Sequence, residues 1–184
     1  MATQAPRHLF TADEYLAMVE AGVLGGDDHV ELLDGEIVEM SPKGDAHSYV
    51  GERLLRLLVL AYEGSGFAVR AASTSRAGVH SVPEPDGAVV PAAVLRIPDL
   101  DQSALVVEIA DSSLSIDRHT KRRIYARAGA PCYWIVEVPA RQVRVLTRPQ
   151  GDDYLGEEIV GEGGVLTLPV VGVEIHVAEV LPPA

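Results

Sequence analysis

The chain has 184 residues, of which 47% are hydrophobic and 23% are charged. This size and composition predict one domain over residues 1–184 and exclude a dependence on disulfide bonds, because a chain of this length buries enough of its own surface. A net charge of −12 excludes an evenly basic nucleic-acid-binding protein. The charge is uneven: residues 1–40 sum to −8 and residues 149–184 to −7, whereas residues 41–148 sum to +3.

The cellular location is predicted from what the sequence lacks. Cys132 is the only cysteine, which favours a reducing compartment. The N-terminal run MATQAPRHLF has no apolar segment of signal-peptide length. Apolar runs elsewhere are far shorter than the roughly 20 residues of a membrane span. We therefore expect a cytoplasmic protein that does not contact membranes.

Three segments in the first third of the chain carry clear boundary signals. Thr11 opens a capping box and predicts a helix that ends at Gly22. Residues 29–40, HVELLDGEIVEM, predict a hairpin that turns at an Asp-Gly pair. Apolar residues at helical spacing predict a long helix over residues 45–63, with Asp45 as its cap.

Short apolar segments in the rest of the chain predict strands, and one amphipathic segment between them predicts a helix. Residues 104–110 form an unbroken apolar run suited to a central strand that is covered on both faces. The helix is expected over residues 116–128 and closes at Gly129. The expected strands cover residues 67–72, 86–90, 104–110, 132–138, 142–148 and 153–160, followed by a strand and a turn in the tail. This order predicts an α/β fold, a mixed β-sheet flanked by helices and preceded by an N-terminal helix and β-hairpin.

Two carboxylates lie against the apolar pattern of these strands. Asp86 opens the strand DGAVV, and Glu108 interrupts the run LVVEIA near its end. Burying a carboxylate at the end of a central strand is costly unless it is paired or binds a cation. Two such carboxylates on neighbouring strands would form an oxygen-rich site suited to Mg²⁺ or Mn²⁺. The alternative is that each carboxylate only caps a strand or pairs with an arginine.

Helical spacing turns one lysine toward the sheet. Lys121 shares a helix face with Ile124 and Tyr125, which we expect to pack on the sheet, so its ammonium is carried inward. An ammonium beside two metal-binding carboxylates can orient an attacking water and stabilise a phosphorane-like transition state. The alternative is a structural ion pair with Asp117 on the same face. Arg122 lies on another face and is less suited to the role.

Five runs of the sequence together resemble one known family. In chain order they are VELLDGEIVEMSP, a helix opened by His47, PEPDGAVV, LVVEIADSS and DRHTKRRIYARAGAPCYWIVEV. Their order and spacing resemble the Uma family (the second of that name) of "putative restriction endonucleases", a branch of the PD-(D/E)XK nuclease superfamily, over roughly residues 8–182. The resemblance implies a restriction-endonuclease-like core in which Pro85-Asp86 is the PD element and Glu108 is the acidic element that follows.

One motif position departs from the superfamily pattern. Ala110 stands two residues after Glu108, where the motif has lysine. The resemblance implies that the following helix supplies this lysine, which agrees with the inward placement of Lys121. It further implies Asp86 and Glu108 as metal ligands, and Lys121 as the water-orienting base or the electrostatic stabiliser.

Four more residues are candidates for supporting roles. Glu31, in the hairpin, is either an additional acidic ligand or an exposed strand carboxylate. His47 is either a core histidine or a phosphate contact at the edge of the site. Glu84, on the same strand face as the PD aspartate, is an alternative ligand. Asp117 is expected to hold the helix lysine in place.

The residues and the resemblance together predict a Mg²⁺- or Mn²⁺-dependent endonuclease. DNA as the substrate comes from the resemblance alone. No nucleotide cofactor is expected, because no glycine-rich phosphate-binding loop is present in the sequence. Two alternatives stay open: an inactive nuclease fold that serves as an interaction or regulatory module, which the acidic ends favour, and a metal-dependent hydrolase of another phosphate ester. A homodimer is expected from the resemblance, with residues 142–148 and 153–160 as edges for pairing.

Overall fold

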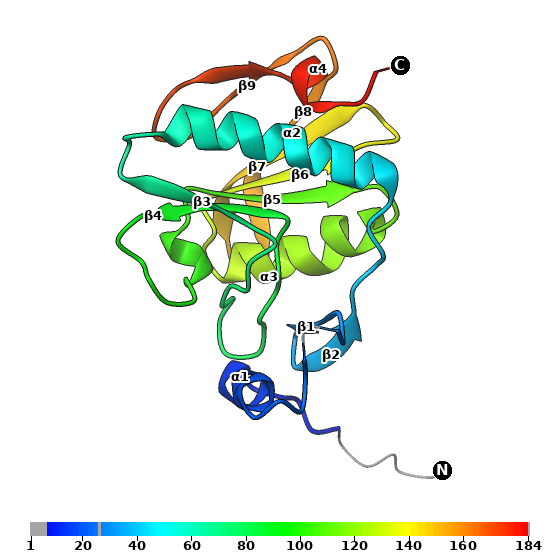
Figure 1. Cartoon of the computed structure of the whole chain (residues 1–184), viewed down its shortest axis with the longest axis vertical. Helices are drawn as coiled ribbons and strands as arrows, with labels where there is room; N and C mark the ends of the chain where they lie inside the picture. The colour runs from blue at the N-terminus through cyan, green and yellow to red at the C-terminus, as the bar shows by residue number, and fades with distance from the viewer. Residues whose placement is uncertain (1–6, 26, 184) are drawn as a thin grey trace.

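The structure of the chain, a computed structural model, describes residues 7–25 and 27–183, so that most of the run MATQAPRHLF lies outside the described residues (Figure 1). None of the described helices is long and apolar enough to cross a membrane. In chain order the helices and strands are α1 (Ala12–Glu20), β1 (Val30–Leu33), β2 (Glu36–Glu39), α2 (Asp45–Tyr62), β3 (Phe67–Ala71), β4 (Gly87–Pro91), η1 (Leu100–Gln102), β5 (Leu105–Ala110), η2 (Ile116–Lys121), α3 (Arg122–Arg127), β6 (Cys132–Glu137), β7 (Gln142–Gln150), β8 (Asp153–Gly161), β9 (Val165–Thr167), β10 (Glu174–His176) and α4 (Val177–Val180).

A six-stranded mixed sheet with the order β3-β4-β5-β6-β7-β8 forms the centre of the molecule (Figure 1). Strands β5 and β6 pair in parallel, and the other neighbours in this sheet pair antiparallel. Parallel neighbours need a long crossover connection, and η2 with α3 supplies it on one face of the sheet. Helix α2 covers the opposite face (Figure 1). The predicted α/β fold, a mixed sheet flanked by helices, is confirmed.

The N-terminal helix and hairpin lie together outside the central sheet, below α3 in Figure 1. The Thr11 capping box begins α1 as predicted, with Glu14 as its other member. Strands β1 and β2 pair through the predicted Asp34-Gly35 turn. Leu32 also forms a bridge with Val82, in the segment before β4. This bridge fastens the hairpin to the chain that leads into the central sheet.

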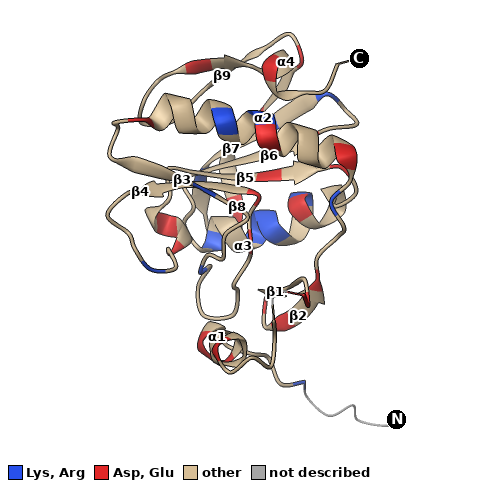
Figure 2. Ribbon diagram, viewed as in Figure 1, with Lys and Arg blue, Asp and Glu red and all other residues tan. Residues whose placement is uncertain are grey.

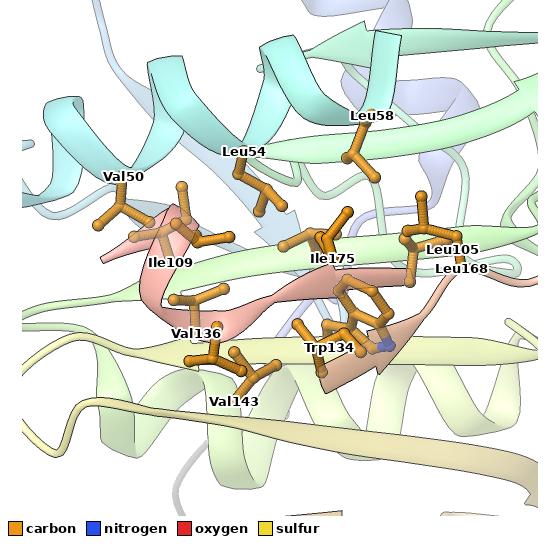
Figure 3. Packing of buried hydrophobic residues seen from close by; sticks show 14 of the residues in the cluster. Val50, Leu54, Leu58, Leu105, Ile109, Trp134, Val136, Val143, Leu168 and Ile175 are labelled. Atoms are coloured by element: carbon orange, nitrogen blue, oxygen red, sulfur yellow. The ribbon is translucent and has the colours of Figure 1, made fainter. Parts of the chain in front are cut away.

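The main hydrophobic core lies between α2 and the sheet (Figure 3). Val50, Leu54 and Leu58 project from α2 at the predicted helical spacing and are buried. They pack in one cluster with sheet residues such as Leu105 and Trp134. Full burial of one such side chain stabilises the fold by about 1.5–3 kcal/mol, so this layer fixes α2 on the sheet.

Two local predictions are wrong, and one strand was missed. The residue that caps α2 is Gly44 rather than Asp45. Asp45 instead lies in the first turn, where its negative charge interacts favourably with the helix dipole. Residues 142–148 do not form an edge, because β7 lies between β6 and β8. The tail has the expected strand, β10, followed by a short terminal helix, α4, and the missed strand β9 pairs with β10.

Candidate active site

Segments that are far apart in the sequence meet at one pocket beside the central strands. The hairpin β1–β2, the loop after it, the start of α2, the segments around β4 and β5, and the helix η2 all contribute to its lining. Figure 2 shows acidic positions on β5 and basic positions on the crossover helix that covers this face. The lining includes all seven of the sequence-derived candidates, Glu31, His47, Glu84, Asp86, Glu108, Asp117 and Lys121.

Asp86 directly precedes β4 and points its two oxygens at different partners. Its Oδ2 accepts a hydrogen bond from the backbone N–H of Ile109 in β5 at 2.9 Å. Its Oδ1 lies 3.0 Å from Lys43 Nζ and 3.0 Å from His47 Nε2. Burial by itself raises the pKa of the Asp86 carboxyl, but these partners outweigh it, so the pKa lies below its usual range. Asp86 is therefore held as a carboxylate.

Glu108 lies inside β5 and is buried. Its Oε1 accepts hydrogen bonds from Lys121 Nζ at 3.0 Å and from the Tyr125 hydroxyl at 2.5 Å. Among the described residues, no hydrogen bond reaches its Oε2. Burial, and then the negative charges of Asp117 and Asp86, raise the pKa of the Glu108 carboxyl well above its usual range despite the nearby ammonium. Burial is the largest cause of this rise, and the lysine offsets it only in part.

Lys121 is the last residue of η2, a π-helical turn that continues into α3. Such turns inside helices occur frequently at functional sites. The Lys121 side chain is 8% exposed, and its Nζ lies 3.0 Å from Glu108 Oε1 and 3.2 Å from Glu31 Oε2. Burial lowers the pKa of the Lys121 ammonium, but Glu108 and Glu31 raise it more, so the net direction is upward. Lys121 is thus a fixed buried cation.

Asp117 does not pair with Lys121, contrary to both the structural alternative and the expected holding role. The Asp117 carboxylate instead accepts a hydrogen bond from the Ser113 hydroxyl at 2.5 Å. It is buried, and burial raises its pKa. Its negative charge still reaches Lys121 electrostatically, so it adds to the acidity of the pocket without fixing the lysine.

Glu31 and Glu84 lie together on the hairpin side of the pocket. Glu31 is 5% exposed, which contradicts the alternative of an exposed strand carboxylate. Its Oε2 contacts the helix lysine and also accepts a hydrogen bond from the backbone N–H of Glu84 at 3.2 Å. Partial burial raises the pKa of the Glu84 side chain, which lines the same pocket. The hairpin therefore brings a further buried carboxylate to the lysine.

Two contacts of the site were not recognised in the sequence. Lys43 has no periodic pattern around it, because it lies in the loop between β2 and α2. Tyr125 was placed on the inward face of its helix but given no role beyond packing. A usable signal for Lys43 was that the chain has only two lysines, and both line this pocket.

The arginines of the crossover do not form a free basic flank. Arg122 pairs with Asp153 and Glu157, which confirms that it points away from the pocket. The neighbouring arginines of this helix are also paired with acids: Arg118 with Glu137, Arg123 with Asp34, and Arg127 with Asp34 and Asp152. Four acidic residues from the two ends of the chain, Asp34, Asp152, Asp153 and Glu157, therefore help to neutralise this helix.

The carboxylates of the pocket determine whether it can hold a divalent cation. Within residues 7–25 and 27–183, no three His, Cys, Asp or Glu side chains are grouped so that they could hold a metal ion. Mg²⁺, however, usually binds through only one or two carboxylates and completes its shell with water and substrate phosphate. Asp86 and Glu108 provide two such carboxylates, and Oε2 of Glu108 has no hydrogen-bond partner among the described residues. The donor set therefore fits Mg²⁺ or Mn²⁺.

Comparisons with known proteins place the fold and the family. A crystal structure described as "a putative nuclease belonging to DUF820", from Anabaena variabilis, is similar to this chain with a TM-score of 0.74 and 14% sequence identity. The similarity covers 93% of this chain and 97% of that one, and it shows a shared fold. No curated protein matches the chain. A family model described as "Putative restriction endonuclease" matches residues 12–178, and the chain therefore belongs to the Uma2 family.

Proposed function

We propose that this protein is a divalent-metal-dependent endonuclease that hydrolyses phosphodiester bonds of DNA. The observation that carries the proposal is the meeting of Asp86, Glu108 and Lys121 in one pocket, two carboxylates from neighbouring strands and a buried ammonium. Family membership supports nuclease chemistry. DNA as the substrate is part of the proposal.

Asp86 and Glu108 would hold Mg²⁺ or Mn²⁺. Their available oxygens are Oδ1 of Asp86, which contacts only the side chains of Lys43 and His47, and Oε2 of Glu108, which has no hydrogen-bond partner among the described residues. When bound, the ion would lower the pKa of a coordinated water and polarise the scissile phosphate. Glu31 and Glu84 line the same pocket and are alternative ligands for the ion.

The protonation of Lys121 favours one of its two candidate roles. A general base must give up its proton, and the raised pKa of this ammonium opposes that. We therefore assign Lys121 as the electrostatic stabiliser of the negative charge that develops on the phosphate. Glu31 and Glu108 hold the ammonium in place, and Tyr125 orients Glu108.

The test is cleavage of plasmid and single-stranded DNA by the wild type and by Asp86→Ala. We expect cleavage that requires Mg²⁺ or Mn²⁺ and stops with a chelator, and a rate lower by at least about 10³-fold in the variant. Arg56→Ala is the matched control, because Arg56 is exposed and lies outside the pocket lining. Cleavage that survives Asp86→Ala would contradict the assignment.

An inactive interaction module remains the second candidate, and one observation favours it. The cations of the pocket already pair with its carboxylates, Lys43 with Asp86 and Lys121 with Glu108 and Glu31. This candidate predicts no hydrolysis of any substrate. Small phosphodiesters in the same assay test the remaining alternative, a hydrolase of another phosphate ester, which would cleave these and spare DNA.

The predicted homodimer and cytoplasmic location stay predictions. For the dimer, β8 is the remaining candidate edge, because it ends the sheet order and exposes Leu155 and Ile159. Equilibrium sedimentation of the purified chain would measure the assembly state.

A further inference from the structure

The use of lysine sets this pocket apart from the rest of the molecule. Of the 15 basic residues, 13 are arginine and two are lysine, and both lysines, Lys43 and Lys121, line the pocket. A guanidinium holds carboxylates in a fixed, two-pronged geometry, whereas an ammonium is a compact charge on a flexible stem. Lysine is therefore the side chain suited to a contact that must be exchanged.

The two lysines are held very differently. The Lys121 side chain is 8% exposed and contacts two carboxylates. The Lys43 side chain is 48% exposed, and Asp86 is its one ion-pair partner among the described residues. When the half-exposed Lys43 ammonium leaves, water can solvate it, and Asp86 keeps His47 and the backbone N–H of Ile109 as partners. Lys43 can therefore leave its partner at little cost, and Lys121 cannot.

The atom that Lys43 contacts is the one that a bound cation would need. Asp86 Oδ2 accepts a hydrogen bond from the backbone N–H of Ile109, whereas Oδ1 contacts only side chains, which can move aside. Lys43 Nζ and His47 Nε2 both lie 3.0 Å from Oδ1. The His47 side chain is only 13% exposed, so of the two, Lys43 is the group with room to move away.

Lys43 is also placed to meet an incoming phosphate. It lies on the exposed loop 41–44, and residues 41–43 of this loop line the pocket. None of the described residues that line the pocket is an arginine, and the other lysine is buried. A phosphate that enters the pocket therefore meets Lys43 as the accessible cation.

We propose that Lys43 is an exchangeable positioning residue for the substrate phosphate. Without a divalent cation it pairs with Asp86 Oδ1, and when a cation takes that oxygen the Lys43 ammonium moves to a phosphate oxygen of the nucleic acid. The inference rests on the proposed function. Lys43 then competes with the metal for Asp86 Oδ1 and strengthens the binding of the substrate. Removal of its charge should therefore affect the binding of the two ligands in opposite directions.

The first experiment compares the wild type with Lys43→Gln and, as a matched loss of one exposed charge, Arg56→Gln. By calorimetry, Lys43→Gln should bind Mg²⁺ about three- to tenfold more tightly than the wild type. A duplex oligonucleotide of about 20 base pairs, titrated in Ca²⁺, should bind about three- to tenfold more weakly to Lys43→Gln, with a salt slope smaller by about one. Arg56→Gln should leave Mg²⁺ binding unchanged.

The second experiment observes the exchange directly. Reductive ¹³C-methylation keeps the lysine charge, and with two lysines the NMR spectrum contains only their signals and that of the terminal amine. Mg²⁺ should shift the Lys43 signal and leave Lys121 nearly unchanged, and Asp86→Asn should abolish the Mg²⁺ effect.

If the wild type binds Mg²⁺ while Lys43→Gln binds both ligands like the wild type, or the Lys43 signal does not respond, this inference is wrong and the proposed function stands. If the wild type binds no divalent cation, the proposed function fails and the inference fails with it.

Discussion

Two buried glutamates on neighbouring parallel strands, Glu108 in β5 and Glu137 at the end of β6, have opposite surroundings. Glu137 accepts four hydrogen bonds, two on each oxygen, from Arg118, Arg144 and Gln142. Glu108 accepts two, both on Oε1. The arginines saturate one carboxylate, whereas the other keeps an oxygen free.

The different surroundings shift the pKa values of the two glutamates in opposite directions. Burial raises the pKa of both carboxyls, but at Glu137 the hydrogen bonds from Arg118, Gln142 and Arg144 outweigh burial and the pKa falls below its usual range. At Glu108 the pKa rises well above it. A buried carboxylate that is fully satisfied contributes to the architecture, whereas one that remains partly unsatisfied can bind a further cation.

The largest expected effect separates the two glutamates by activity. Glu108→Gln should lower the rate of the proposed metal-dependent DNA cleavage on the order of 10³-fold, because it removes a carboxylate proposed to hold the metal while keeping the shape of the side chain. Glu137→Gln should change the rate of the folded protein by less than about fivefold, because Glu137 is outside the pocket lining. Initial rates of plasmid cleavage in Mg²⁺ measure both. Equal losses in the two variants would contradict the different roles of the two glutamates.

The same two substitutions should also differ in their effect on stability, and here Glu137→Gln should have the larger effect. Glu137→Gln should lower the free energy of unfolding by about 3 kcal/mol, because Arg118 and Arg144 lose the carboxylate that satisfies them. Glu108→Gln should change it by less than about 1 kcal/mol, because Lys121 keeps Glu31 as its partner and a buried charge is removed. Urea unfolding without divalent cations measures both variants. A destabilisation confined to Glu108→Gln would reverse the assignment.

The smallest effect is a pH dependence of the Glu137 contribution. Because its pKa is lowered in the folded state, the carboxylate stabilises the fold fully above its unfolded value of 4.5, and this stabilisation is lost as the pH falls from there through the folded pKa. Each unit of pKa difference corresponds to about 1.4 kcal/mol. The stability difference between wild type and Glu137→Gln should be constant from pH 6 to 7 and shrink below pH 4.5. A difference that stays constant down to pH 3 would contradict this account.

Local signals in the sequence predicted the elements well. The Thr11 capping box, the Asp34-Gly35 turn and the apolar strand runs fixed where helices and strands lie. Asp86 and Glu108 stood out because a carboxylate is unexpected in an apolar strand. Lys121 could be placed because helical spacing tells which side chains share a face.

The partners of the buried charged residues could not be predicted from the sequence, because they come from distant segments of the chain. Glu137 carried the same signal as Glu108, a carboxylate in an apolar strand, yet its partners come from η2 and β7 and could not be assigned from local pattern. Glu31 reaches Lys121 only because the hairpin is fastened beside β4 through the Leu32 and Val82 bridge. Lys43 lies in a loop, where no periodicity tells the direction of a side chain.

The paired arginines of the crossover have a consequence for the kinetics of encounter. Acids from the hairpin and from β8 cancel their charge locally, so nothing offsets the overall −12 at the distance from which DNA approaches. Salt screens the repulsion between two polyanions at longer range, so they repel each other mainly within about one Debye length, about 10 Å at 0.1 M salt. The association rate with DNA should therefore rise with added salt, the reverse of electrostatic steering. For this protein a divalent counterion atmosphere would help to bring the partners together before any ion enters the pocket.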